Sequence, residues 1–249
     1  MRKSILYIIN LFIFLPAVFA QSQSGVINYT VTYNWLKMSA SVAYMPKDNT
    51  DRMSYVWGNN SESNTYAVLT YNDSTYSFAF KEDDANDDWG SGKKELYNIN
   101  RNYIDNKSYD FRELVGKKYL VIDSVPPQKW RIKNNMKEIA GHMCMNAEYY
   151  DTIKEHLIEA WFALDMPLSI GPAEYFGLPG TILEINKANG SVVYTATSII
   201  PSKDKINIEK GKKAKKIKII TYTEYNKIIW EKYQESKKMK RPYFWNIGF

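Results

Sequence analysis

The stretch DMPLSIGPAEYFGLPGTILEI spans Asp165–Ile185 and holds three prolines and three glycines among its 21 residues. Proline fixes φ, and glycine reaches backbone conformations that other residues avoid, so a run of both types shapes the chain and brings no reactive groups. We therefore expect a rigid, packed crossover over residues 165–180. This crossover would deliver Thr181–Ile185 into a sheet.

Two local structures are predicted inside the crossover. Leu178–Thr181 has the signature of a type II turn, because proline sets φ at the first central position and glycine supplies positive φ at the second. Gly171–Gly177 fits one helical turn, with Pro172 at its first position and a glycine just past its end. The glycines, the prolines and Leu178 are interpreted as architectural.

A functional role for the crossover is the alternative interpretation. The segment would then form the lip of a binding pocket, with its polar and aromatic side chains exposed to a ligand. The residues that could act in this way are Glu174, Tyr175, Phe176 and, in the following strand, Glu184.

Strand patterns continue on both sides of the crossover. Asn189-Gly190 is a two-residue hairpin signal between the predicted strands Thr181–Asn186 and Ser191–Ile199. Alternation of apolar and polar residues, or short apolar runs between turn residues, predicts further strands. These are Gly25–Asn34, Ser39–Met45, Arg52–Trp57, Thr65–Thr70, Ser74–Phe80, Lys117–Ser124, Gln128–Lys133, Lys137–Ile139, Met143–Asp151 and Leu157–Leu164.

The C-terminal part predicts one amphipathic helix over Thr221–Lys240. Thr221 and Glu224 fit a capping box, and apolar residues recur at helical spacing after them. A basic run at Lys210–Lys218 precedes the helix, and the aromatic ending YFWNIGF is read as a docked final strand. The expected fold is mainly β, or β-rich α+β: a curved antiparallel sheet or half-barrel meander with one C-terminal helix.

The first 20 residues, MRKSILYIINLFIFLPAVFA, have the features of a secretory signal peptide: a basic start, a short apolar run and small residues before Gln21. An uncleaved anchor helix is the alternative. Removing residues 1–20 takes away Arg2 and Lys3 but no acidic residue, so the net charge falls from +6 to +4. Residues 21–249 are read as one domain that is exported to the periplasm or surface of a Gram-negative bacterium and is not an integral membrane protein.

A series of short motifs in the second half of the chain resembles one family. In chain order they are Trp130–Ile132, Lys137–Gly141, Cys144–Ala147, Ala160–Phe162, Pro167, Gly171-Pro172 and Gly177–Leu183, followed by the basic stretch and helix at Gly211–Tyr225. Together with the signal peptide, this order resembles the GLPGLI family of exported Bacteroidetes proteins. Thr181 stands where that family usually has leucine, and a buried hydroxyl there needs a partner. The resemblance implies no catalytic residues.

His142 and Cys144 suggest a soft-metal site. Alternate residues of a strand share a face, and imidazole and thiolate are ligands for copper or zinc. His156 is the candidate for a third ligand. The opposing interpretation is a buried, inert thiol among core side chains, and Cys144 is the single cysteine of the chain, so it has no internal disulfide partner.

Enzyme activity has less support. The chain has no Gly-x-Ser-x-Gly motif and two histidines that could act as a base. A hydrolase with convergent carboxylates at Glu155, Glu159 and Glu184 is the remaining alternative.

We expect a non-enzymatic binding or interaction protein without a cofactor. Its partner would be an apolar or glycan ligand on an aromatic-rich concave face, or another envelope protein. Export argues against nucleic acid as the partner of the basic run.

Overall fold

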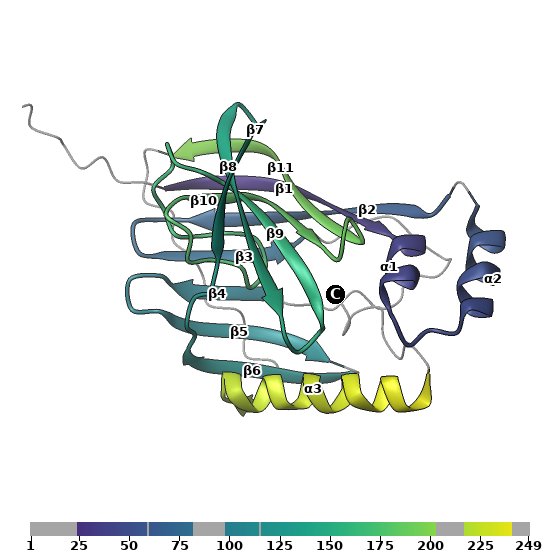
Figure 1. The fold of residues 1–249 in the computed structure, drawn as a ribbon. Coiled ribbons are helices and arrows are strands. Elements are labelled where there is room, and N and C mark those ends of the chain that lie inside the picture. The colour runs from purple at the N-terminus through teal and green to yellow at the C-terminus, as the bar shows by residue number, and fades with distance from the viewer. Residues whose placement is uncertain (1–23, 59, 82–97, 115, 203–216, 241–249) are drawn as a thin grey trace, which may run out of the picture.

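The computed structural model describes residues 24–58, 60–81, 98–114, 116–202 and 217–240. Its dominant feature is one open sheet of twelve strands (Figure 1), so the predicted mainly β fold with a curved, largely antiparallel sheet is confirmed. The predicted signal peptide, most of the basic run and the final aromatic segment lie outside the described residues. No helix within the described ranges is long and apolar enough to cross a membrane.

The strands follow a simple order in the sheet, β12-β6-β5-β4-β3-β2-β1-β11-β10-β9-β8-β7. In chain order they are β1 (Ser24–Asn34), β2 (Glu62–Tyr71), β3 (Thr75–Phe80), β4 (Asn98–Asn102), β5 (Lys107–Leu114), β6 (Lys117–Ser124), β7 (Arg131–Ile139), β8 (His142–Asp151), β9 (His156–Ala163), β10 (Thr181–Lys187), β11 (Val192–Ser202) and β12 (Lys218–Ile220). Among these described strands, all pairs are antiparallel except β12 with β6.

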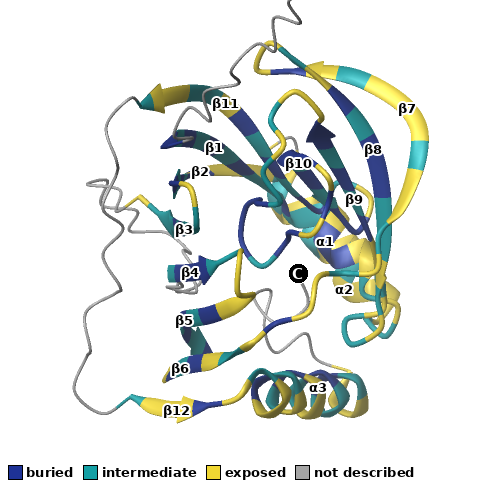
Figure 2. Ribbon diagram, turned by 90° about the vertical axis from the view of Figure 1, so that its left-hand side faces the viewer, coloured by how far each residue is buried: buried dark blue, intermediate teal, exposed yellow. Residues whose placement is uncertain are grey.

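Two meanders meet at β1, which pairs with β2 on one edge and with β11 on the other. The sheet is bent so that the wing with β8 and β9 faces the wing with β4–β6, as both ribbon views show (Figures 1 and 2). The main core lies between these wings. It includes Ile27 of β1, Phe78 of β3 and Phe162 of β9, all fully buried.

The crossover runs through this core. Ile170, Ala173, Tyr175 and Leu178 are all buried in the cluster that joins the wings. The concave face is therefore filled in large part by the chain's own residues. The turns of the crossover must fit between the side chains of the two wings. This requirement explains why the segment is rich in proline and glycine.

The turns inside the crossover differ from the prediction. Gly180 does not have the positive φ that a type II turn requires; positive φ occurs instead at Gly177 (93°) and Ala173 (52°). A Cβ at Gly180 would lie 2.1 Å from the carbonyl oxygen of Ala163, so close backbone packing requires this glycine. The predicted helical turn is a tight turn in which the Tyr175 amide donates to the Pro172 carbonyl at 3.2 Å.

Helix α3 (Tyr222–Met239) confirms the predicted C-terminal helix, including its capping box between Thr221 and Glu224. The helix packs against β6 and bridges the wings, because Lys237 donates to Glu155 in the β8–β9 turn at 2.9 Å. Tyr225 and Ile229 of the helix belong to a smaller apolar cluster, which also contains Tyr119 and Val121 of β6.

The strands predicted at Ser39–Met45 and Arg52–Trp57 are wrong. These residues belong to or follow α1 (Trp35–Ser41) and α2 (Lys47–Trp57). The Asn34 side chain accepts a hydrogen bond from the Lys37 amide and so starts α1 directly after β1. The β10–β11 hairpin is present, but its loop is four residues long, since Lys187 pairs with Val192.

Candidate functional site

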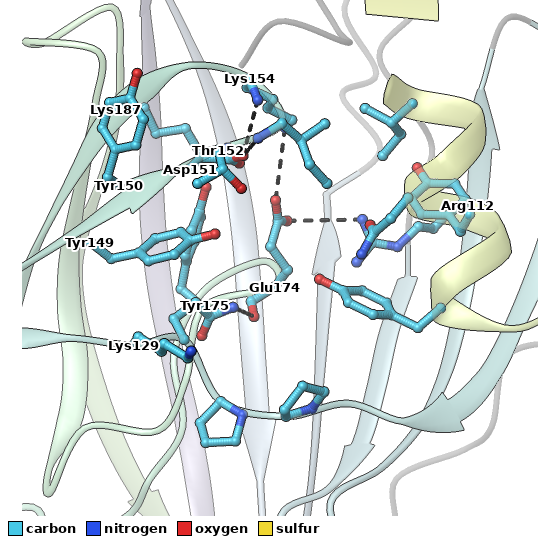
Figure 3. A pocket seen from close by; sticks show the side chains of 18 of the residues that line it. Arg112, Lys129, Tyr149, Tyr150, Asp151, Thr152, Lys154, Glu174, Tyr175 and Lys187 are labelled. Atoms are coloured by element: carbon cyan, nitrogen blue, oxygen red, sulfur yellow. Dashed lines mark hydrogen bonds and ion pairs between the residues drawn. The ribbon is translucent and has the colours of Figure 1, made fainter. Parts of the chain in front are cut away.

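A cavity of about 580 Å³ opens between the two wings (Figure 3). Its walls come from the end of β5, the β6–β7 connection, the β8–β9 turn, the crossover, the end of β10 and one face of α3. Cavities of this size hold small-molecule ligands in many proteins. The polar and aromatic lining residues are Arg112, Gln128, Lys129, Tyr149, Tyr150, Asp151, Thr152, Lys154, Glu174, Tyr175, Lys187, Tyr222, Tyr225 and Asn226.

The crossover is held at Glu174 by two side chains that bind its backbone. Arg101 Nη1 and Gln128 Nε2 donate to the Glu174 carbonyl oxygen at 2.8 and 3.0 Å. Gln128 Oε1 also accepts from the Phe176 amide at 3.1 Å, and Trp130 Nε1 donates to the Phe176 carbonyl at 2.8 Å. These bonds fix the direction in which the Glu174 side chain leaves the backbone.

The Glu174 carboxylate lies among three cations. Its two oxygens are each 4.0 Å from one of them, Oε2 from Arg112 Nη1 and Oε1 from Lys154 Nζ, and Figure 3 shows both side chains directed toward it. Burial alone would raise the pKa of Glu174, but Lys187, Lys154 and Arg112 together hold that pKa well below its ordinary value. Glu174 is therefore ionised at neutral pH and is a poor proton donor.

The buried carboxylate of Asp110 orients the Arg112 guanidinium. Asp110, which is fully buried, accepts from Arg112 Nη2 at 3.2 Å and from Arg101 Nη2 at 3.3 Å. The Arg112 guanidinium also lies over the Tyr225 ring of α3, 5.0 Å from its centroid. Its Nε atom is buried and has no hydrogen-bond partner among the described residues.

Aromatic side chains surround the charged groups. Five tyrosines of the described residues line the cavity, namely Tyr149, Tyr150, Tyr175, Tyr222 and Tyr225. Lys187, only 2% exposed, lies between the rings of Tyr175 and Tyr194, with Nζ 5.1 Å from each centroid. Tyrosines offer both a face for stacking and a hydroxyl for hydrogen bonding, so this lining suits a polar ligand with an apolar face.

The structure brings Glu174 and Tyr175 together in the cavity, but not on an exposed lip. Tyr175 and Phe176 are 2% and 3% exposed, because the crossover runs inside the sheet and not over its rim. Phe176 packs under the Arg101 guanidinium, whose carbon lies 4.7 Å from the ring centroid. Glu184 lies elsewhere on β10 and accepts from Lys137 at 2.7 Å.

The motif residues of the crossover have structural surroundings. Leu178 is a core residue, and Pro179 is exposed. Gly171 passes so close to the Tyr175 carbonyl that a Cβ would lie 2.6 Å from it, and a Cβ at Gly177 would meet Pro127 at 2.3 Å. Gly171 and Pro172 are both buried.

The three candidate metal ligands are not brought together. His142 begins β8, whereas His156 pairs with Asp151 at the other end of that strand. His142 Nδ1 lies 2.7 Å from Asp165 Oδ2, and burial raises the pKa of the Cys144 thiol to about 11, which disfavours the thiolate that binds metals. Among the described residues, no three His, Cys, Asp or Glu side chains are placed to hold a metal ion.

The carboxylates suggested for a hydrolase also do not converge on one site. Glu155 accepts from Lys237 of α3, Glu159 from Asn186 at 3.4 Å, and Glu184 from Lys137. Each carboxylate therefore has a different partner, and none of the three lines the cavity as the described residues form it.

The sequence interpretation missed the cations of the site. Arg112, Lys154 and Lys187 come from three separate segments, and none belongs to a motif. One signal was available for Lys187, which alternates in step with the buried Leu183 and Ile185. A lysine on the apolar face of a strand indicates a buried charge with a specific environment.

A family model matches a segment that forms part of this site. A model of a family described as a protein of unknown function (Porph_ging) matches residues 148–184, which include the β8–β9 turn and the whole crossover. A search of curated proteins found no match.

Solved structures show the same fold. Two structures of PNGF-II, in space groups P21 and C2, match with TM-scores of 0.54 and 0.52 at 14% and 16% sequence identity. Each match covers 84% of this chain and 33% of the PNGF-II chain, so the present chain corresponds to about a third of that protein's length. At such low identity the likeness shows the fold alone.

Proposed function

We propose that this chain is an exported, GLPGLI-type binding protein that holds a small polar ligand in the cavity between its two wings. The observation that carries the proposal is the cavity itself: about 580 Å³, lined by tyrosines and by charged side chains held in fixed positions. A binding role also agrees with the depressed pKa of Glu174, since a permanently ionised carboxylate does not serve as a general acid.

The lining favours a sugar-like ligand over a purely apolar one. An apolar ligand would cover the charged and hydroxyl groups of the cavity lining without offering them a polar partner, which is costly. A sugar offers hydroxyl groups to these side chains and a C–H face to the tyrosine rings. Of the two ligand classes predicted from the sequence, the glycan is therefore the one we propose.

A matched pair of substitutions on α3 tests whether the cavity is the binding site. Asn226 lines the cavity, whereas the adjacent Lys227 is exposed, with 74% of its side chain accessible. Asn226→Trp fills the cavity, and Lys227→Trp places the same side chain in solvent. Titration calorimetry with a panel of neutral and acidic mono- and disaccharides should show binding to the wild type and to K227W but not to N226W.

Equal binding to N226W and K227W would locate the ligand outside the cavity and reject the proposal. Binding of no sugar in the panel would reject the glycan class. Export is tested separately by expressing the full chain in a Gram-negative host and measuring the intact mass of the envelope fraction. We expect a chain that begins at Gln21, and retention of residues 1–20 would reject the signal peptide.

A further inference from the structure

The charges of the cavity are not balanced. Four basic side chains among the described residues line it, those of Arg112, Lys129, Lys154 and Lys187, against two acidic ones, Asp151 and Glu174. Asp151 is committed to the protein backbone, because its Oδ1 accepts from the amides of Ile153 and Lys154 at 2.8 and 3.0 Å. Asp110 pairs with Arg112 from outside the lining, so Glu174 is the main acidic side chain on the cavity side of these cations.

Glu174 does not form hydrogen bonds with the nearest cations. Its oxygens lie 4.0 Å from Arg112 Nη1 and from Lys154 Nζ, beyond the usual N–H···O range of about 2.7–3.2 Å. Several other lysine–glutamate pairs of the described residues are closer, such as Lys137–Glu184 at 2.7 Å and Lys232–Glu235 at 2.6 Å. Glu174 thus faces Arg112 and Lys154 as an opposite charge, without a short hydrogen bond to either.

These cations are also largely removed from water. The side chains of Arg112 and Lys154 are 10% and 11% exposed, Lys187 is 2% exposed, and the buried Nε of Arg112 has no partner in the described part of the chain. Attraction between opposite charges is stronger in such a site than at an open surface. An incoming anion could therefore take short hydrogen bonds that Glu174 leaves unmade.

From this geometry we infer that the ligand is a sugar bearing an oxyanion, a carboxylate or a phosphate, whose charged group binds Arg112 and Lys154 in competition with Glu174. Lys187, which is buried, adds to the positive electrostatic potential at this position. The inference rests on the proposed function, since it names the ligand class of the same cavity. Glu174 acts as an internal counter-ion that keeps the cations in place when the cavity is empty.

Three probes that share one sugar frame separate the possible sources of the charge: galactose, galacturonate and galactose 6-phosphate. We expect at least one of the two acidic probes to bind the wild type about ten times more tightly than galactose does. A carboxylate preference or a phosphate preference is read directly from which of the two binds. Because the contact is ionic, raising NaCl from about 0.05 to about 0.5 M should weaken the acidic probe severalfold and leave galactose unchanged.

Two substitutions test the roles of the charged residues. Lys154→Met keeps the length of the side chain but removes its charge, and should weaken binding of the acidic probe about tenfold, a much larger loss than for galactose. Glu174→Gln removes the competing charge and should strengthen acidic-probe binding severalfold. Lys227→Met, on the exposed face of α3, is the control and should change neither.

The outcomes distinguish the inference from the function on which it rests. If galactose and both acidic sugars bind equally and N226W abolishes all three, the cavity binds sugars but the anion inference is wrong. If E174Q weakens binding of the acidic probe, Glu174 does not compete with the anionic group of the ligand and the inference is rejected. If no probe binds, both proposals fail. The salt dependence of the wild type decides the matter even if a variant is unstable.

Discussion

The hydroxyl group of Tyr29 donates a 2.7 Å hydrogen bond to the backbone carbonyl of Ile182, across the middle of the core. This bond joins the central strand β1 to Ile182, which is the second residue of β10, the strand that follows directly after the crossover. Tyr29 is 1% exposed, and burial raises the pKa of its hydroxyl well above the ordinary value. The hydroxyl therefore stays protonated, and remains a donor, at neutral pH.

Removing this hydroxyl group should destabilise the whole domain. We expect Tyr29→Phe to lower the free energy of unfolding by about 1–3 kcal/mol, because the Ile182 carbonyl loses its donor in a water-free environment. Urea unfolding followed by tryptophan fluorescence measures the change. Tyr66→Phe is the control: Tyr66 is 49% exposed on β2, and its change should stay within about 0.5 kcal/mol. Equal effects of the two substitutions would contradict the role given to Tyr29.

Thr181 has the partner that its burial requires. Its single O–H is shared between the carbonyl oxygens of Met166 and Leu168, at 3.2 and 3.3 Å, and so connects the end of the crossover to its beginning. Thr181→Val preserves the shape of the side chain and should cost about 1–2 kcal/mol of stability, measured by urea unfolding. Thr181→Ser keeps the hydroxyl; a serine variant less stable than the valine variant would show that packing of the methyl group matters more.

Gly180 should tolerate no side chain. A Cβ at this position would lie 2.1 Å from the Ala163 carbonyl oxygen, so Gly180→Ala must displace β9 and should cost about 3 kcal/mol or more. Gly141 provides a comparison, because its φ is positive but no described atom lies within 4 Å of the position that a Cβ would take there. Gly141→Ala should therefore cost only about 1 kcal/mol. Thermal unfolding of both variants tests the difference, and similar melting temperatures would refute it.

The stability of the protein should fall between about pH 6.5 and 4 because of His156. Burial and the nearby Lys154 lower the pKa of His156 to about 4, while the unfolded chain takes up this proton near pH 6.5. In this window the unfolded state binds more protons, so stability decreases as the pH falls, by about 2–3 kcal/mol in total.

Urea unfolding at about pH 4.5–7 measures this dependence. His156→Asn retains a donor near the Lys154 carbonyl, which His156 Nδ1 contacts at 3.2 Å, but cannot titrate. The variant should lose most of the slope above about pH 5. Glu174 contributes at lower pH: its pKa is depressed, so its stabilisation is lost as the pH falls below the ordinary glutamate value. An unchanged slope in H156N would rule out His156 as its source.

The single cysteine should be unreactive in the folded protein. Cys144 is fully buried, and its pKa is raised to about 11, so little thiolate exists at about pH 8. Iodoacetamide should modify it about a hundred times more slowly than it modifies the urea-unfolded chain, as followed by mass spectrometry. Rapid modification under native conditions would show that the thiol is accessible, and would revive the soft-metal hypothesis for His142 and Cys144.

Local signals predicted much of the fold correctly. The capping box at Thr221 located α3, and the apolar run in Lys117–Ser124 located β6 with the same bounds. The first of the two N-terminal helices was missed because Ser39–Met45 alternates small residues with more apolar ones, as a strand does. Here Asn34 starts a helix and Trp35 stacks on Tyr33, 5.8 Å between centroids, so tertiary packing overrides the local pattern.

The candidate site was harder to predict because its charges lie on unexpected faces. In β5, Asp110 and Arg112 are buried, while Tyr109 and Phe111, which a hydrophobic pattern would place inward, are only partly buried. Glu174 and Tyr175 were identified for their place beside the turns, yet their burial depends on the sheet folding around the crossover. No spacing in the sequence shows that Arg112, Lys154 and Lys187 meet there.

The central place of β1 also has a consequence for how the chain acquires its structure. The first strand to be made pairs with β2 early, but its other edge waits for β11, and Tyr29 meets its partner Ile182 across 153 residues. Pairings of such long range slow folding, since a large loop must close before any contact compensates for the lost entropy. Until β11 has paired with β1, one edge of β1 has no neighbouring strand. A chain truncated before residue 192 should therefore stay unfolded or aggregate, even if strands β1–β6 have paired with one another.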